Sequence, residues 1–302
     1  MKTIILKVAD VPFALHTDDW HETTQCLPSY PAFHITPAQS KELGEDFAFE
    51  MDVNLHDVDI TPDDESLLKF EASDLNNEIL RRKDGGYKFV IALPDGTQAA
   101  IGECNDDYSR FNVKTIGTME ARSCGLNNLI MMAFAFASAS RGVLLVHSSV
   151  VFHNGAANLF LGKSGTGKST HSRLWMENIA ETELLNDDNP AVRAFADGRM
   201  MVYGTPWSGK TPCYRNLQFP INAIVSLHQA PANDIKQLNA IHAFSTFFPS
   251  CSMIKWDDRN RAQVISNVEA VVKHVPVYSL DCLPNAEAAL LCQQTVEGGG
   301  RS

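Results

Sequence analysis

The sequence predicts an α/β protein in which a layered α/β core with a substantial sheet follows a mostly antiparallel β domain. Before about residue 118, short runs alternate apolar and polar residues, the period of a half-buried strand. After it, apolar runs with helical spacing alternate with strand-like runs, which favours layers of helices on a sheet. With 302 residues, 44% of them hydrophobic, the chain can bury one large core or two modest ones. We expect a β-rich domain over 1–118, an α/β domain over 119–297 and a mobile tail over 298–302.

The first domain carries the clearest strand signals. Apolar residues alternate from Phe47 to Val53 and again from Tyr87 to Ile91, and the turn Pro94-Asp95-Gly96 leads into a strand over Thr97–Ile101. The acidic stretch Asp57–Glu65 is most simply an exposed loop or the start of a helix. No motif in this domain indicates a reaction, so selecting a substrate and mediating oligomerisation both remain open as its role.

The second domain begins with a predicted helix over Glu120–Arg141, where apolar residues recur at helical spacing until Gly142. Strands and helices then alternate. We predict strands over Val143–Val151, Ala157–Leu161, Glu183–Asn186, Ala223–His228 and Val277–Leu280, and helices over Lys168–Asn178, Val264–His274 and Asn285–Gln294.

Composition narrows the class of protein. The formal net charge of −11 gives no field that would attract a polyanion or an anionic membrane, so we expect neither nucleic acid nor membrane as a partner. The apolar region Leu129–Phe152 is interrupted by Arg141, Gly142 and His147, which favours a buried helix and strand over a membrane span. Seven scattered cysteines and an amino terminus unlike a signal peptide predict reduced thiols and a cytoplasmic location.

The most specific motif is a complete G-x-x-x-x-G-K-S match: Gly162-Lys163-Ser164-Gly165-Thr166-Gly167-Lys168-Ser169. It lies between a predicted strand and a predicted helix. Glycines let successive backbone N–H groups point inward, and a helix amino terminus adds partial positive charge at the same place, which suits a polyphosphate. We expect Lys168 to reach the β and γ oxygens of ATP, Ser169 to bind Mg²⁺, and Thr170 to extend the binding segment. The alternative is a Gly-rich turn that binds nothing.

A pair of carboxylates follows this loop. Asp187 and Asp188 follow directly after the predicted strand Glu183–Asn186, and Asp187 lies 25 residues after Gly162. Two adjacent carboxylates at a strand end allow one to face Mg²⁺ and the other to accept a proton from an attacking hydroxyl. The pattern does not decide which does which, and a simple turn is the alternative, because Asn186–Pro190 is rich in turn formers.

Together with His147, fifteen residues ahead of Gly162, these motifs resemble the superfamily of HPr kinase/phosphorylase and the ATP-dependent phosphoenolpyruvate carboxykinases. The resemblance covers roughly 142–226. It implies a P-loop kinase-like (PEP carboxykinase-like) core in which Lys168 and Ser169 hold phosphate and Mg²⁺, and Asp187 and Asp188 share the metal and base roles. It also implies that His147 lies beside the aspartates, where it would hydrogen-bond to a carboxylate or contact the transferring phosphoryl group.

The chain departs from the HPr kinases downstream. Where they have a Glu-x-Arg-Gly signature, this sequence has Tyr203-Gly204-Thr205-Pro206-Trp207-Ser208-Gly209-Lys210-Thr211, followed by Arg215. This difference puts HPr in doubt as the substrate. The segment is a constrained loop that would aim Lys210 and Arg215 at phosphoryl charge and close Trp207 over a ligand. The alternative is a surface turn with an incidental lysine and a packed tryptophan. His171 and Trp175 are expected to pack.

The predicted function is an ATP- and Mg²⁺-dependent phosphotransferase, with a serine hydroxyl of a protein, peptide or small molecule as the acceptor. Asp187, Asp188, His147, Lys168 and Lys210 are the catalytic candidates. Two alternatives remain: a nucleotide-binding regulatory or scaffold protein that transfers nothing, and a phosphorylase that runs the reaction in reverse. Homo-oligomers are a further expectation from the resemblance, and the base preference is open because such a loop contacts only phosphates.

Overall fold

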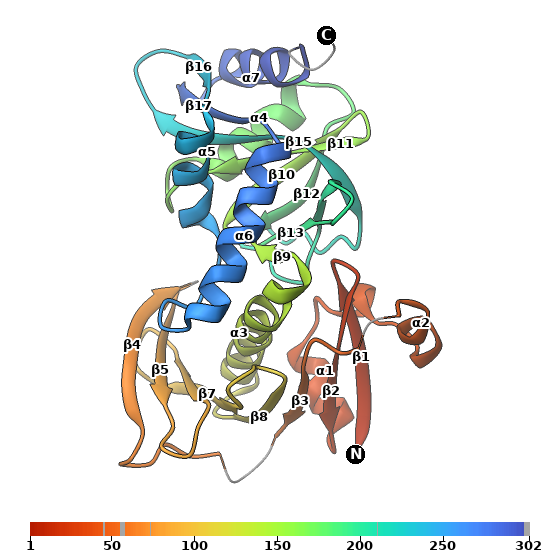
Figure 1. The fold of residues 1–302 in the computed structure, drawn as a ribbon, viewed down its shortest axis with the longest axis vertical. Helices are drawn as coiled ribbons and strands as arrows, with labels where there is room; N and C mark the ends of the chain where they lie inside the picture. The colour runs from red at the N-terminus through yellow and green to blue at the C-terminus, as the bar shows by residue number, and fades with distance from the viewer. Residues whose placement is uncertain (45, 55–57, 73, 210, 299–302) are drawn as a thin grey trace. The chain divides into compact units, whose positions relative to one another are not determined.

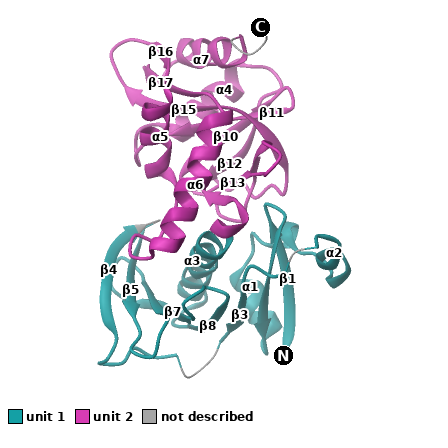
Figure 2. Ribbon diagram, viewed as in Figure 1, with its two compact units in different colours: residues 1–138 teal, residues 139–302 magenta. Residues whose placement is uncertain are grey.

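Two large sheets organise the mixed α/β structure (Figure 1), a computed structural model that describes residues 1–44, 46–54, 58–72, 74–209 and 211–298. The chain divides into unit 1, Met1–Ser138, and unit 2, Ala139–Ser302 (Figure 2). This boundary lies twenty residues after the one expected from the sequence. The reason is that helix α3 (Met119–Ser138) packs against the strands of unit 1. Of the tail expected to be mobile, Gly298 ends the last helix, and 299–302 lie outside the described residues.

Unit 1 contains one sheet that is mostly antiparallel, as the sequence predicts. Within the described residues its strands follow the order β1-β2-β3-β8-β7-β6-β5-β4, and only the β2–β3 and β3–β8 pairs are parallel. The strands are β1 (Lys2–Val8), β2 (Val11–Thr17), β3 (Glu50–Val53), β4 (Glu65–Ala72), β5 (Leu75–Arg81), β6 (Tyr87–Ala92), β7 (Gln98–Cys104) and β8 (Arg110–Thr115).

Helix α3 packs against this sheet at β6, β7 and β8. Gly125 brings the helix close, because a Cβ at this position would lie 2.7 Å from the Ala100 Cβ on β7. Phe134 and Phe136 on the helix meet rings from the strands, among them Phe13 and Phe89. Two short helices, α1 (Trp20–Cys26) and α2 (Pro37–Glu42), and a 3₁₀ turn at Pro31–Phe33 complete the unit.

Unit 2 is built around a sheet whose parallel centre is β11-β15-β17. Within the described residues the strand order is β12-β10-β11-β15-β14-β13-β9, with β17 also beside β15 and β16 beside β17. The strands are β9 (Val143–Leu145), β10 (Ser148–His153), β11 (Ala156–Leu161), β12 (Glu183–Asp188), β13 (Ala191–Ala194), β14 (Met200–Tyr203), β15 (Gln218–Gln229), β16 (Asp234–Gln237) and β17 (Val277–Cys282). The helices are α4 (Lys168–Asn178), α5 (Ala240–Phe247), α6 (Asp258–His274) and α7 (Ala286–Gly298), with 3₁₀ turns at Ala139–Arg141 and Phe248–Ser250.

Alternation along the strands sends successive side chains into two separate cores. Val150 and Leu159 pack with residues of α5 and α6, whereas their neighbours Val151 and Phe160 pack with residues of α4 and α7. Helices therefore cover both faces of the sheet, which is the layered α/β architecture expected from the sequence. Phe247 is fully buried in the first of these cores, where Phe244 and Phe248 pack beside it.

One predicted strand proved to be two. The apolar run Val143–Val151 divides at Val146 and His147, because β9 pairs with β13 whereas β10 pairs with β11 and β12. At the break, the His147 N–H donates to the Ser250 carbonyl at 2.7 Å. Periodicity in one segment cannot reveal such a change of partner, because the partners are distant in sequence.

Candidate functional site

The predicted site residues come together because three neighbouring strands end at one edge of the unit 2 sheet. In the antiparallel registers, Ser148 at the start of β10 lies opposite both Leu161 at the end of β11 and Asp188 at the end of β12. His147, which precedes β10, and Gly162, which follows β11, are therefore brought to the same edge. Helix α4 begins directly after the loop that follows β11 (Figure 1).

The loop between β11 and α4 has a backbone that only glycine adopts easily. Gly165 and Gly167 have φ values of 80° and 111°, in the left-handed region. Gly162 needs its small size, because a Cβ there would lie 3.1 Å from the Thr166 side chain. Gly167 is the N-cap of α4 and supplies no side-chain cap, and the first turn of the helix contains no acidic residue. The first N–H groups of α4 and the positive end of its dipole are therefore not offset by a capping side chain or by an acidic residue of the helix.

The amine of Lys168 lies at the centre of the site. Its Nζ donates to the Gly162 carbonyl at 2.9 Å and lies 2.8 Å from His147 Nε2. Burial lowers the pKa of Lys168, and the opposite effect of Asp188 and Asp187 only partly offsets this. Because an ammonium group can only donate, His147 Nε2 must accept the hydrogen bond.

This contact fixes the proton on the other ring nitrogen of His147. Nδ1 lies 3.0 Å from Asp188 Oδ1, so the ring donates to Asp188 on one side and accepts from Lys168 on the other. The other oxygen of Asp188 accepts from the Asn189 amide at 2.7 Å. The structure thus places Asp188, His147 and Lys168 in one chain of hydrogen bonds.

Asp187 belongs to a second, separate contact. The Ser169 hydroxyl donates to Asp187 Oδ1 at 2.9 Å, and Asp187 is only 5% exposed. Its backbone carbonyl accepts from the Gly209 N–H at 2.6 Å. A Cβ on Gly209 would lie 2.9 Å from that carbonyl oxygen, so a glycine is required where this segment crosses the end of β12.

The remaining loop candidates lie where the motif predicts them, in the loop and in the first turn of α4. Lys163 and Ser164 are exposed in the loop, and Thr170 follows Ser169 in the first turn of α4. His171 and Trp175 are buried, as expected, with the Trp175 indole donating to His171 Nε2 at 3.2 Å. Burial lowers the pKa of His171 to about 4.

Trp207 and Arg215, in and after the segment 203–211, do not take the active-site roles predicted for them. Trp207 is 2% exposed and belongs to the interior, so it cannot close over a ligand. Arg215 pairs with Glu183 at 2.6 Å, at the opposite end of β12 from the two aspartates, so its predicted approach to phosphoryl charge is wrong. Lys210 lies outside the described residues.

Sequence reasoning missed the residues that support the aspartates. Asn186 is fully buried, donates to the Trp207 carbonyl at 3.1 Å and accepts from the Asn189 N–H at 3.1 Å. It therefore ties the downstream segment to the end of β12. Gln229, whose side-chain amide contacts carbonyl oxygens of the loop, was missed as well. The sequence signal for Asn186 was its position between the apolar run Leu184-Leu185 and the two aspartates, because a polar side chain at the end of a buried strand needs hydrogen-bond partners.

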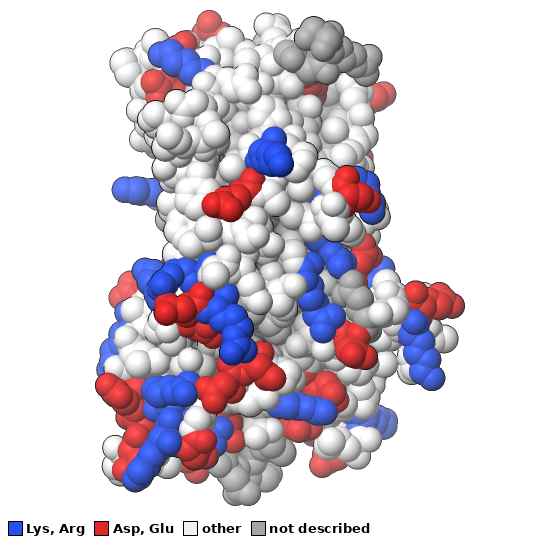
Figure 3. Space-filling view, viewed as in Figure 1, with Lys and Arg blue, Asp and Glu red and all other residues white. Residues whose placement is uncertain are grey.

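Four further observations concern the other predictions. Over the described part of the chain, no group of three or more His, Cys, Asp or Glu side chains is placed to hold a metal ion by itself. All seven cysteines are free. Among the helices of the described ranges, none has the length and apolar character needed to cross a membrane. On the face shown in Figure 3, charged side chains of both signs are interspersed over the elements of unit 1.

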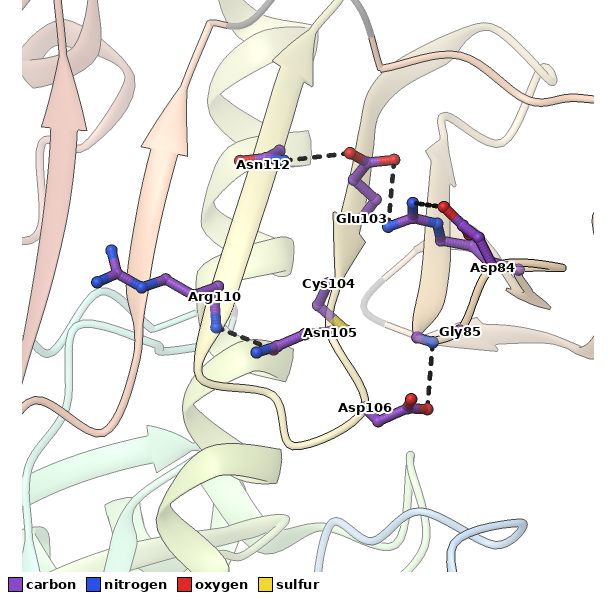
Figure 4. A pocket seen from close by; sticks show the side chains of 10 residues that line it. Asp84, Gly85, Glu103, Cys104, Asn105, Asp106, Arg110 and Asn112 are labelled. Atoms are coloured by element: carbon purple, nitrogen blue, oxygen red, sulfur yellow. Dashed lines mark hydrogen bonds and ion pairs between the residues drawn. The ribbon is translucent and has the colours of Figure 1, made fainter.

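Unit 1 contains a hollow of about 290 Å³ that none of the predicted site residues lines (Figure 4). Its charged groups already have partners: Glu103 accepts from the Asn112 amide and pairs with Arg82, which also pairs with Asp84 at 2.6 Å. The charged groups of this hollow are therefore hydrogen-bonded or paired with one another.

Comparisons with known proteins identify no family for this chain. No protein-family model matches the chain, and no curated protein matches it. Among solved structures, the chain is similar to the Hpr(Ser) kinase/phosphatase from Coxiella burnetii, with 12% identity and a TM-score of 0.30 over 51% of this chain and 95% of that one. A TM-score this low carries no argument about fold or activity.

Proposed function

We propose that unit 2 is an ATP- and Mg²⁺-dependent phosphotransferase that transfers the γ-phosphoryl group to a hydroxyl, with serine as the first acceptor to test. The observation that carries the proposal is the arrangement around Lys168. A glycine-rich loop, a helix start and a half-buried lysine converge with two aspartates and a histidine at one sheet edge. A half-buried lysine whose pKa is lowered by burial, in contact with a histidine beside a glycine-rich loop, favours a reaction site over a structural turn.

The two aspartates face different partners, and this suggests different roles. Asp187 lies within hydrogen-bond distance of the Ser169 hydroxyl, and a hydroxyl beside a carboxylate fits Mg²⁺. This ion is held by one or two protein oxygens together with phosphate and water. Bound there, Mg²⁺ would neutralise charge on the β and γ oxygens.

Asp188 is the better candidate for the base. Its contact with His147 Nδ1 at 3.0 Å orients the carboxylate, and its side chain is 20% exposed, so an acceptor hydroxyl can reach it. Asp188 also has a φ of 155°, which non-glycine residues rarely adopt, and such strain is common at reaction sites. Lys168 would contact the transferring oxygens, and His147 would hold both Lys168 and Asp188 in place.

The test measures transfer of labelled γ-phosphate from ATP in the presence of Mg²⁺ to free serine, serine-containing peptides and cell extract. We expect Asp188→Asn to reduce transfer at least about a hundredfold while the affinity for ATP changes little. Asp187→Asn should weaken Mg²⁺-dependent binding as well. Asp197→Asn is the matched control, because Asp197 is an exposed aspartate that pairs with Arg199 in a turn of the same unit.

Two results would decide against the proposal. Transfer by Asp188→Asn at the wild-type rate would remove the base assignment. Binding of ATP by the wild type without transfer to any acceptor, unchanged in both aspartate variants, would favour the nucleotide-binding regulatory alternative. Transfer of the phosphoryl group from a phosphorylated acceptor to added phosphate, giving pyrophosphate and the free hydroxyl, or to ADP, giving ATP, would instead indicate the phosphorylase direction.

A further inference from the structure

Gln229 is the last residue of β15, and its side-chain amide reaches the predicted phosphate-binding loop. Its Nε2 lies 3.3 Å from the Thr166 carbonyl oxygen and 3.4 Å from the Gly165 carbonyl oxygen. Both carbonyls belong to the glycine-rich part of the loop. No motif singled out this glutamine, because it lies more than sixty residues after the loop in sequence.

The register of the parallel strands explains why Gln229 lies there. Leu161, the last residue of β11, lies opposite Ser226 of β15. Beyond this point the chain of β11 turns into the loop, whereas β15 continues for three more residues beside it. Those residues stay paired with β17, and Gln229 itself lies opposite Cys282. The side chain is therefore presented by a paired strand and not by a flexible segment.

A hydrogen bond to a carbonyl also orients the N–H of the same peptide. The peptide unit is planar and trans, so its C=O and N–H point in opposite directions. The Thr166 carbonyl shares its peptide with the N–H of Gly167, the residue that caps α4. A donor at this carbonyl therefore directs the Gly167 N–H away from β15. The Gly165 carbonyl shares its peptide with the Thr166 N–H, which closes the turn by donating to the Lys163 carbonyl at 3.0 Å.

This anchoring matters because glycine loses more conformational freedom on ordering than any other residue. Gly165 and Gly167 flank the two peptides, and their Cβ positions would meet open space, so packing does not hold them. A loop ordered only when a ligand arrives would bind that ligand more weakly.

We propose that Gln229 is a positioning residue that pre-orders the loop for polyphosphate by binding its Gly165 and Thr166 carbonyls. This inference rests on the proposed function, because it assumes that the loop binds phosphates. It predicts that losing the amide donor weakens binding of the polyphosphate itself, whatever nucleoside is attached. Transfer would fall only through this loss of affinity, since Gln229 touches neither aspartate.

The test compares two variants by calorimetric titration with Mg²⁺-tripolyphosphate. Gln229→Met removes the donor without adding charge, and Gln229→Glu replaces the amide by a nearly isosteric carboxylate. We expect about three- to tenfold weaker binding in Gln229→Met and a larger loss in Gln229→Glu, which also repels the carbonyls and the anion. Gln237→Glu is the control, because it makes the same charge change on an exposed glutamine of β16.

A second measurement separates this inference from the proposed function. Amide hydrogen exchange of the peptide covering 162–170, measured without ligand, should be faster in Gln229→Met than in the wild type, while urea unfolding midpoints agree. Equal exchange and equal tripolyphosphate affinity in wild type and variants would overturn the positioning role. If the wild type bound neither tripolyphosphate nor ATP, the proposed function would fail, and the exchange comparison would still decide whether Gln229 orders the loop.

Discussion

Replacing Lys168 by methionine should abolish polyphosphate binding with little loss of folding stability. Methionine has a similar length but no charge, so it removes the Nζ contacts with Gly162 and His147 while filling the same space. Charged hydrogen bonds contribute about 1.5–3 kcal/mol each, so two phosphate contacts correspond to a loss of at least about a hundredfold in affinity. Lys273→Met, which makes the same change on an exposed lysine in the last turn of α6, is the matched control.

The lowered pKa of Lys168 also predicts the direction in which folding stability changes with pH. Burial lowers the pKa of Lys168 below its ordinary value of 10.5. The unfolded chain therefore binds this proton more tightly, and between the two pKa values folding becomes more favourable as pH rises. Relative to Lys168→Met, which lacks the group, the wild type should gain stability as the pH rises from the lowered pKa of folded Lys168 toward 10.5.

The assays are urea unfolding of both proteins at several pH values and titration with Mg²⁺-tripolyphosphate. The contributions of the other titrating groups are shared by the two proteins, so they cancel in the difference between the two free energies of unfolding. Retention of wild-type affinity by Lys168→Met would refute the assignment of this lysine to the phosphates. A stability difference that does not change with pH would refute the argument from burial.

Three further predictions concern stability and local fit. Because burial holds the pKa of His171 at about 4 against 6.5 in the unfolded chain, this group should cost at most about 3 kcal/mol of stability as pH falls from 6.5 to 4, and His171→Phe should flatten that slope in urea unfolding. Gly125→Val should destabilise the protein by at least about 1–3 kcal/mol in chemical unfolding, because its Cβ would lie 2.8 Å from the β7 backbone. Gly209→Ala should lower phosphoryl transfer about tenfold with a smaller effect on tripolyphosphate affinity, because the new Cβ would lie 3.2 Å from the Cβ of Asp188, the proposed base, as well as 2.9 Å from the Asp187 carbonyl oxygen.

The elements nearest the loop could be predicted because their signals are local. The strand 157–161, the motif and the helix Lys168–Asn178 follow from apolar runs, glycines and a G-K-S sequence that need no distant partner. The aspartate pair was also placed at a strand end, although β12 extends two residues beyond the predicted Asn186. Local pattern therefore fixes where the site lies along the chain.

Contacts between distant segments decided what the sequence could not. His147 was expected beside the aspartates, but its contact with Lys168 depends on the division between β9 and β10. Trp207 and Arg215 have residue types common in active sites, yet one is buried and the other pairs with Glu183. A residue type shows what a side chain can do, and only the tertiary pairing shows which partner it has.

The hydrogen bonds divide the site into two halves that meet at the loop. One half is the Ser169–Asp187 contact, and the other is the chain from Asp188 through His147 to Lys168. In the proposed site, a change at Asp187 would act on the phosphates through Mg²⁺, whereas a change at Asp188 would act on them by way of His147. Since His147 contacts both the proposed base and the lysine proposed to bind phosphate, its loss should affect binding and transfer together, whereas Asp188→Asn should affect mainly transfer.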